Sequence, residues 1–259
     1  YLKLYEDVEL KENVSLENIH HHTGENAAMS EEELRLTTKQ YYAAISGLDK
    51  QFGRLMGFLK ENNLYEDTLV ILSADHGDMM GSHGLMGKHV WYEESIKIPF
   101  VLHVPGNNNK RCYTCIGSQD MMPTVLGLLS CSIPDTVEGE DCSKFIKGTE
   151  DRNRVSFIMA CPGRADFVEK FKKAGKDPAG FGWRGVRTQE YTYVMELGYD
   201  VISNPKRYLY DIKNDPQQKT ILDLEIEENK RLAKTMEEEV IKWMERQNDG
   251  FLKNWKTAL

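Results

Sequence analysis

Apolar residues between positions 41 and 59 recur every three or four residues, which is the spacing of one face of an α-helix. Ser30 lies before this stretch, and Glu33 lies three residues after Ser30. Such a pair predicts a capping box, in which each side chain bonds the backbone of the other residue. The pattern therefore predicts an amphipathic helix that begins after Ser30 and ends near Lys60.

Two short apolar runs follow this helix, and each predicts a β-strand. Residues 68–73 are almost wholly apolar, and residues 98–104 end at the turn Pro105-Gly106. Helix, turn and apolar strand in this order are typical of an α/β fold. We expect the strand over 68–73 to be covered on both faces of a parallel sheet. The apolar stretch 121–129 predicts a buried helix.

The pattern changes near Gly148, where shorter runs alternate with turn residues. These runs predict an antiparallel sheet with strands over 155–160, 183–188, 191–197 and 207–211. Apolar residues spaced at three or four between Ile226 and Met244 predict a helix packed on that sheet. We expect two domains, residues 1–148 with an irregular lead-in over 1–30, and residues 149–259.

Composition narrows the class of protein. The chain has 259 residues and a net charge of −8, which argues against general nucleic-acid binding because phosphate contacts need a basic surface. No stretch approaches the roughly 20 apolar residues that span a bilayer, so we expect a soluble chain without a membrane span. Tyr1 and its neighbours show neither an initiator Met nor a signal-peptide pattern. We expect a fragment or processed chain, and cytoplasmic, periplasmic and secreted locations are not distinguished.

The five cysteines do not indicate a disulfide framework, because their number is odd and they are sparse. Cys112 and Cys115 have the spacing of a metal or redox pair, yet no second pair accompanies them, which favours ordinary thiols. Cys161-Pro162-Gly163-Arg164 is one residue short of a Cys-x-Pro-x-Arg nucleophile motif, which argues against a catalytic role.

The strongest chemical signal follows the predicted strand over 68–73. Ligands of open α/β sheets bind at the carboxyl ends of the strands, and Asp75 and His76 come directly after this strand. The glycine-rich stretch 77–87 can fold tightly around a ligand, and Lys88 next to it provides an ammonium group suited to a tetrahedral oxyanion. Alternatively, Asp75 caps a helix and His76 makes a structural hydrogen bond. The histidine run His20-His21-His22 favours a solvated loop over a metal site, because no acidic or Cys partner is near.

These residues resemble the sulfatase family of the alkaline-phosphatase-like superfamily. The resemblance covers most of residues 35–220 and is carried by a set of segments at characteristic spacing, which are Ser73–Asp78, Gly81–Gly84, Gly87-Lys88, Tyr92–Ser95, Pro99-Phe100, Tyr41–Asp49 and Arg207–Pro216. It implies an α/β fold containing the C-terminal part of an alkaline-phosphatase-like core sheet with flanking helices. A small antiparallel sheet packed on a C-terminal helix would follow it.

The resemblance also implies roles for individual residues. Asp75 would ligate a divalent metal, most often calcium in this family, with magnesium or manganese as alternatives. His76 would ligate the metal or contact the sulfate or nucleophile, since hard cations prefer oxygen to nitrogen. Lys88 would bind the sulfate and stabilise the charge developing on the leaving oxygen. His83 and His89 are candidate substrate-binding residues.

Family members use a formylglycine nucleophile, matured from a Cys/Ser-x-Pro/Ala-x-Arg motif, and an N-terminal Asp pair. We expect both to lie outside this chain, and the isolated chain to be inactive, because covalent catalysis needs nucleophile, activator and charge stabilisation together. In the intact protein we expect a sulfuric ester hydrolase that acts on a small-molecule or glycan sulfate ester, with the N-terminal half of the same protein as partner. The alternatives are a phosphonate or phosphate ester hydrolase of the same superfamily and a non-catalytic homologue.

Overall fold

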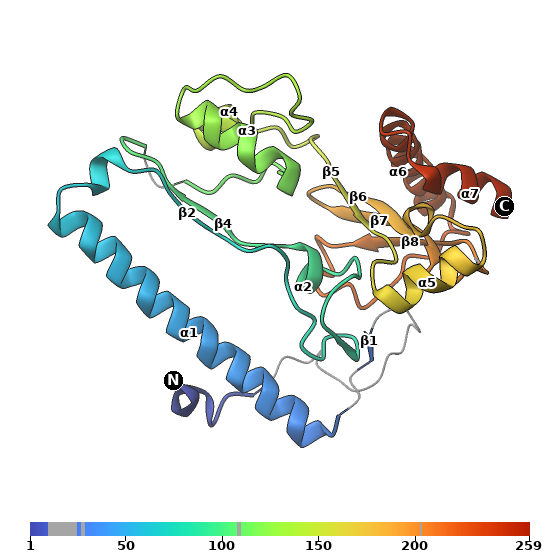
Figure 1. The fold of residues 1–259 in the computed structure, drawn as a ribbon, viewed down its shortest axis with the longest axis horizontal. Coiled ribbons are helices and arrows are strands. Elements are labelled where there is room, and N and C mark those ends of the chain that lie inside the picture. The colour runs from blue at the N-terminus through green and yellow to red at the C-terminus, as the bar shows by residue number, and fades with distance from the viewer. Residues whose placement is uncertain (10–24, 27–28, 108–109, 203) are drawn as a thin grey trace. The chain divides into compact units, whose positions relative to one another are not determined.

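The structure is a computed structural model, and it describes residues 1–9, 25–26, 29–107, 110–202 and 204–259 (Figure 1). The chain divides into two compact units, Tyr1–Asn109 and Lys110–Leu259. The predicted domain boundary near residue 148 falls inside the second unit. Each unit has its own secondary structure.

The long helix of the first unit, α1, spans Glu31–Glu61, as the apolar spacing predicts. Ser30 and Glu33 form the predicted capping box, with the Glu33 amide donating to Ser30 Oγ at 3.2 Å and the Ser30 amide donating to Glu33 Oε2 at 2.8 Å. The short 3-10 helix η1, Leu2–Tyr5, packs on α1, where Tyr5 Oη and Ser46 Oγ lie 2.6 Å apart. The apolar stripe of α1 is largely exposed in the described chain, with Leu48 at 70%.

The strands β2 (Val70–Ser73) and β4 (Phe100–His103) lie where the apolar runs predict them, but they form an antiparallel pair. The expectation of a parallel, doubly covered strand is therefore wrong for the described residues. Leu72 and Val101 are paired in register, and they are 40% and 56% exposed. A wholly apolar run does not reveal which strand is its neighbour, because strand pairing is decided by contacts distant in sequence.

Four short elements complete the first unit. The 3-10 helix η2 spans Tyr65–Asp67, the strands β1 (Glu25–Asn26) and β3 (Leu85–Met86) pair antiparallel, and helix α2 spans Glu93–Ile96. Within the described residues, no helix is both long and apolar enough to cross a membrane.

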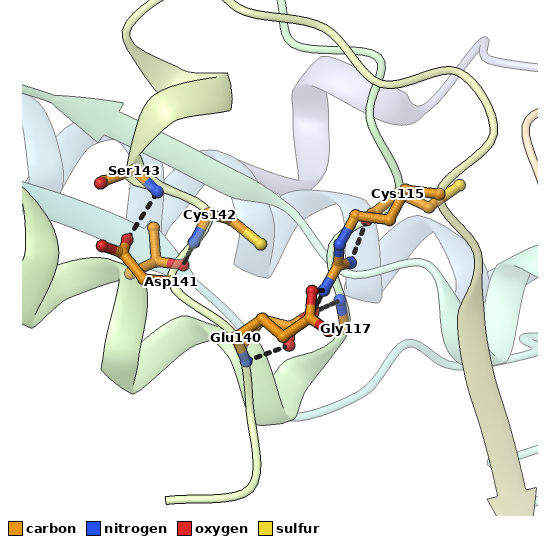
Figure 2. Close-up of polar contacts among 9 residues, drawn as sticks. Cys115, Gly117, Glu140, Asp141, Cys142 and Ser143 are labelled. Carbon is orange, nitrogen blue, oxygen red and sulfur yellow. Dashed lines mark hydrogen bonds and ion pairs between the residues drawn. The ribbon is translucent and has the colours of Figure 1, made fainter. Parts of the chain in front are cut away.

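The second unit begins with α3 (Ser118–Leu128) and α4 (Ser143–Ile146), joined by a buried polar cluster (Figure 2). Asp120 is the centre of this cluster. Its carboxylate accepts hydrogen bonds of 2.9 Å from the Gly117 amide, the Glu140 amide and Arg154 Nη2. The α3 helix is buried on the Asp120 side, whereas Met122 is 51% exposed, so the prediction of a buried helix holds for one face only.

The predicted antiparallel sheet is confirmed. It contains β5 (Ser156–Ala160), β6 (Gly182–Arg187), β7 (Tyr191–Gly198) and β8 (Lys206–Asp211) in sequential order. On one face, Tyr193, Met195 and Leu197 of β7 join the core of the unit. On the opposite face, Glu196 is buried and accepts a 2.8 Å hydrogen bond from Tyr208 Oη.

Helix α6 (Glu227–Arg246) confirms the predicted C-terminal helix and buries Met236, Val240 and Met244 in the core. The sequence did not predict α7 (Gly250–Ala258), which buries Phe251 and Trp255 there. Residues 161–182 contain α5 (Ala165–Lys173) and the 3-10 helix η3 (Pro178–Gly180), neither of which the sequence predicted. Phe171 of α5 supplies the apolar contact that holds this helix, since its side chain is fully buried.

Candidate active site

The candidate site lies in the chain segment that leaves β2. This segment turns at Gly77, whose amide donates to the Ser95 carbonyl at 2.9 Å. A Cβ atom at Gly77 would lie 1.9 Å from the Glu94 carbonyl oxygen, so any other residue would force the two backbones apart. Glycine is therefore needed here for the close approach of two segments that are distant in sequence.

A hairpin over residues 79–87 follows and positions Lys88. The Met79 amide donates to the Gly87 carbonyl at 2.7 Å, and the Gly81 amide donates to the Leu85 carbonyl at 2.8 Å. Gly87 has φ +69°, a left-handed conformation that costs little without a side chain. The hairpin returns the chain so that Lys88 faces the residues that follow β2.

The structure brings three predicted site residues together. Lys88 Nζ contacts His76 Nε2, and Asp75 Oδ2 lies 3.2 Å from the same nitrogen. The His76 amide donates to Asp75 Oδ1 at 3.0 Å. The Asp75 side chain is otherwise open, at 85% exposed, and His76 is partly buried. A carboxylate, an imidazole and an ammonium group thus share one small region.

The surroundings of Nδ1 favour one tautomer of the neutral His76 ring. Nδ1 lies 2.8 Å from the Gly77 carbonyl oxygen, which only accepts, so Nδ1 carries the proton. In the neutral ring, Nε2 then holds the lone pair and accepts from the Lys88 ammonium. The hydrogen bond from the His76 amide, with the positive charge of Lys88 as a smaller cause, lowers the pKa of Asp75. Asp75 is therefore a carboxylate at neutral pH, ready to bind a cation.

The other two histidines lie in different surroundings. His83 is 6% exposed, and its ring stacks on that of Tyr92, with centroids 3.8 Å apart and planes 9° from parallel. His89 is exposed and has φ +76°. Tyr92 is fully buried, and sequence reasoning gave it no role. A signal for it exists in the sequence, because Tyr92 adjoins Trp91 and large aromatic side chains bury much of their surface against packing partners.

The residues present fit part of a divalent-metal site. The Asp75 carboxylate and the His76 Nε2 lone pair are two suitable donors, but calcium takes about six to eight oxygen ligands. Across the described part of the chain, no group of three or more His, Cys, Asp or Glu side chains could hold a metal ion. The single lone pair of His76 Nε2 can either accept a hydrogen bond from the Lys88 ammonium group or coordinate a metal ion, but it cannot do both at once.

Of the two other sequence candidates, the structure describes the cysteines. Cys112, Cys115, Cys131, Cys142 and Cys161 are all free thiols. Cys115 and Cys142 are buried, and burial raises the pKa of the Cys142 thiol. The histidine run at 20–22 lies outside the described residues.

One segment of the chain matches the Ser-x-Pro-x-Arg pattern by residue type alone. Residues 203–207 read Ser-Asn-Pro-Lys-Arg and match Ser-x-Pro-x-Arg by residue type. Ser203 lies outside the described residues. Arg207 donates to Glu237 at 3.0 and 3.2 Å and lies over the Trp255 ring, 4.9 Å from its centroid. The arginine of this match is thus part of the packing of α6 and α7 on β8.

Comparison with known proteins identifies the family. The model of the sulfatase family matches residues 16–131, and the model of the C-terminal region of N-sulphoglucosamine sulphohydrolase matches residues 81–246. A solved structure from Bacteroides thetaiotaomicron, concerned with glycosaminoglycan metabolism, has a TM-score of 0.74 at 26% identity and covers 99% of this chain and 51% of its own. The fold is that of the alkaline-phosphatase-like superfamily. Within this superfamily, the chain belongs to the sulfatase family.

Curated relatives agree with this assignment. An ulvan-active sulfatase of Formosa agariphila is 32% identical over 82% of this chain and 41% of its own length. An endo-4-O-sulfatase of Bacteroides thetaiotaomicron is 29% identical over 79% of this chain and 40% of its own. The chain thus spans about two fifths of the length of these relatives. A phosphonate monoester hydrolase of Agrobacterium radiobacter shares the fold, with a TM-score of 0.70 at 23% identity, covering 85% of this chain and 43% of its own.

Proposed function

We propose that this chain forms the sulfate-binding part of a sulfuric ester hydrolase. The observation that carries the proposal is the contact of Lys88 with His76 beside the Asp75 carboxylate, on the loop after β2. An ammonium group binds a tetrahedral oxyanion well. Family membership supports a sulfate ester as this anion.

Each site residue receives a role under this proposal. Lys88 binds a sulfate oxygen and stabilises negative charge on the leaving oxygen, which is the group whose charge grows in the transition state. Asp75 ligates a divalent metal, which supplies polarisation of the sulfate when bound. His76 ligates that metal or contacts the sulfate. His89, exposed beside Lys88, contacts the substrate, and His83 is a second candidate for such a contact.

The metal under this proposal is calcium, with magnesium or manganese as alternatives, and the nucleophile is a formylglycine outside this chain. The Ser203 match does not supply it, since the partners of Arg207 are Glu237 and Trp255. Charge stabilisation without an activated nucleophile does not cleave a sulfate ester. We therefore expect the isolated chain to be inactive and to need the N-terminal half of the protein as its partner.

The substrate class under this proposal is a glycan or small-molecule sulfate ester. Support comes from the names of the relatives, which include an ulvan-active sulfatase, an endo-4-O-sulfatase and a choline-sulfatase of Rhizobium meliloti. A phosphonate or phosphate ester hydrolase is the second candidate, favoured by the imidazole at position 76, which suits zinc or manganese better than calcium. A non-catalytic homologue is the third candidate.

The test is an NMR titration that measures the binding of inorganic sulfate to the 259-residue chain. We expect Lys88→Met to weaken sulfate binding by about tenfold or more, because a hydrogen bond to a charged group is lost. Lys97→Met is the matched control, since Lys97 is exposed and pairs with Glu93 at 3.2 Å. The proposal fails if Lys88→Met and Lys97→Met bind sulfate equally.

Two further measurements separate the candidates. Tighter binding of inorganic phosphate than of sulfate at a pH where both are dianions would favour the phosphoester reading. Turnover of an aryl sulfate by the purified chain with calcium would overturn the expectation that it is inactive.

A further inference from the structure

The segment that carries Lys88 is bounded by two stacked rings. His83 and Tyr92 lie on either side of it in sequence, and their rings lie 3.8 Å apart and nearly parallel. Both residues are buried, at 6% and 0% exposed. Because the two rings are held together, both ends of the segment between them are held as well.

His83 is fixed by the turn in which it lies. It has φ +57°, a left-handed conformation that His and Asn adopt more readily than most residues. The Ser82 amide donates to the Met79 carbonyl at 2.7 Å, and the Leu85 amide donates to the Ser82 carbonyl at 3.0 Å. These bonds set the direction in which the His83 side chain leaves the backbone.

Tyr92 connects the same stack to the His76 side of the site. Its carbonyl accepts from the amides of Ser95 and Ile96 at 2.9 and 3.0 Å, which begins α2. The Ser95 carbonyl in turn accepts from the Gly77 amide at 2.9 Å, and the Gly77 carbonyl accepts from His76 Nδ1. A continuous set of contacts thus runs from the His83 ring to the His76 ring.

We propose that His83 is a positioning residue, which acts through its stack on Tyr92 to hold Lys88 against His76. Burial of the His83 ring favours this role over direct contact with the substrate. The hairpin brings the ammonium group to the site, and the stack restricts the movement of the hairpin. The consequence of the stack for sulfate binding rests on the proposed function, whereas its effect on the hairpin does not.

Two substitutions separate the ring from the backbone conformation. His83→Asn keeps a residue that tolerates the left-handed conformation but removes the ring. His83→Phe keeps a ring that can stack on Tyr92. If the stack restricts the hairpin over residues 79–87, His83→Asn removes this restriction and His83→Phe retains most of it.

The first unit also offers a matched control. His103 stacks on Tyr65 with centroids 3.8 Å apart and planes 17° from parallel, and its Nε2 lies 2.9 Å from the Tyr65 carbonyl. His103→Asn removes a stack of the same kind, outside the hairpin. This variant measures how much stability the unit loses when a His–Tyr stack is removed away from the hairpin.

Two readouts test the proposal on the 259-residue chain. Hydrogen exchange of the Met79, Gly81 and Leu85 amides measures the hairpin itself, and NMR titration with inorganic sulfate measures its consequence. We expect His83→Asn to accelerate exchange and weaken sulfate binding by up to about tenfold, the upper range for an aromatic pair. We expect His83→Phe to keep the exchange rates and the sulfate affinity close to those of the wild-type chain. We expect His103→Asn to leave both quantities unchanged, although it lowers the thermal midpoint about as much as His83→Asn does.

The proposal is overturned if His83→Asn leaves the exchange of the hairpin amides unchanged, or if His103→Asn changes it equally. If the wild-type chain binds no sulfate, the proposed function loses its support, and the exchange data still decide whether the stack holds the hairpin. Normal exchange in His83→Asn together with weakened sulfate binding would indicate direct contact with the anion, and would overturn the positioning role.

Discussion

The ion pair of Arg184 with Asp249 allows a quantitative prediction for the second unit. Arg184 is 1% exposed, and it donates to Asp249 at 2.5 and 3.1 Å. It also donates to the Ala179 carbonyl at 2.7 Å and lies over the Phe251 ring, 4.9 Å from its centroid. Asp249 is the N-cap of α7, where it accepts from the Phe251 amide at 2.9 Å. The pair therefore joins β6 to the last helix.

Asp249→Asn removes the charge and keeps the capping group, since Asn caps helices as well as Asp does. Breaking a buried ion pair costs about 3–5 kcal/mol, because the remaining charge stays buried. The backbone carbonyls around Arg184 still accept its protons, so we expect the lower end, about 3 kcal/mol of the free energy of unfolding. Asp249→Ala should cost about 1 kcal/mol more through loss of the cap.

Urea unfolding followed by tryptophan fluorescence measures this change, with Trp255 of α7 as a buried local probe. A loss of about 3 kcal/mol moves the urea midpoint by about 1–3 M at ordinary m-values. The control is Asp177→Asn, at the exposed N-cap of η3, where Asp177 accepts from the Ala179 amide at 2.9 Å. A cost below about 1 kcal/mol for Asp249→Asn, or an equal cost for Asp177→Asn, would refute the reasoning.

Three further predictions concern thiols, the surface and pH. Iodoacetamide should label exposed Cys131 and spare buried Cys142 in the native chain, as peptide mass spectrometry will show. Leu48→Lys should reduce self-association in light scattering without lowering the thermal midpoint, because Leu48 is 70% exposed on α1. Burial raises the pKa of Cys142 above its ordinary 9.0, and burial with Glu237 nearby raises that of Tyr193 above its ordinary 10.0. The unfolded chain then loses these protons first, so the free energy of unfolding should fall as pH rises above about 9, as urea titrations will measure.

Each of these predictions has a contradicting result. Equal labelling of Cys131 and Cys142 would show that the second thiol is accessible. A lower thermal midpoint for Leu48→Lys would mean that the residue packs within the chain. A free energy of unfolding that is constant or rises above about pH 9 would contradict the direction of the two pKa shifts.

Local patterns in the sequence predicted much of this fold. The capping box at Ser30, the apolar spacing of α1 and α6, and the alternation in β5 to β8 are short-range features, and short-range interactions set them. The same patterns did not predict α5 and α7. Helices α5 and α7 have 9 residues each, which is shorter than the stretch over which helical periodicity is read with confidence, and α7 follows α6 after a short break.

The sequence also predicted one part of the candidate site and missed another. The types and spacing of Asp75, His76 and Lys88 suggested an anion and metal site, and their resemblance to sulfatases gave it a class. The spacing alone did not show that Lys88 reaches His76 Nε2, because that contact depends on the hairpin and on the close approach of Gly77 to Glu94. It also did not show that the His83 ring is buried.

The sequence by itself thus determined the secondary structure of the main elements, the family and the candidate site residues. These follow from periodicity, capping and residue types at fixed spacing, which are local properties. Only the tertiary structure decided the antiparallel pairing of β2 with β4, the contact of Lys88 with His76 and the stack of His83 on Tyr92. Each depends on how separate segments of the chain pack against one another, and no local pattern records that packing.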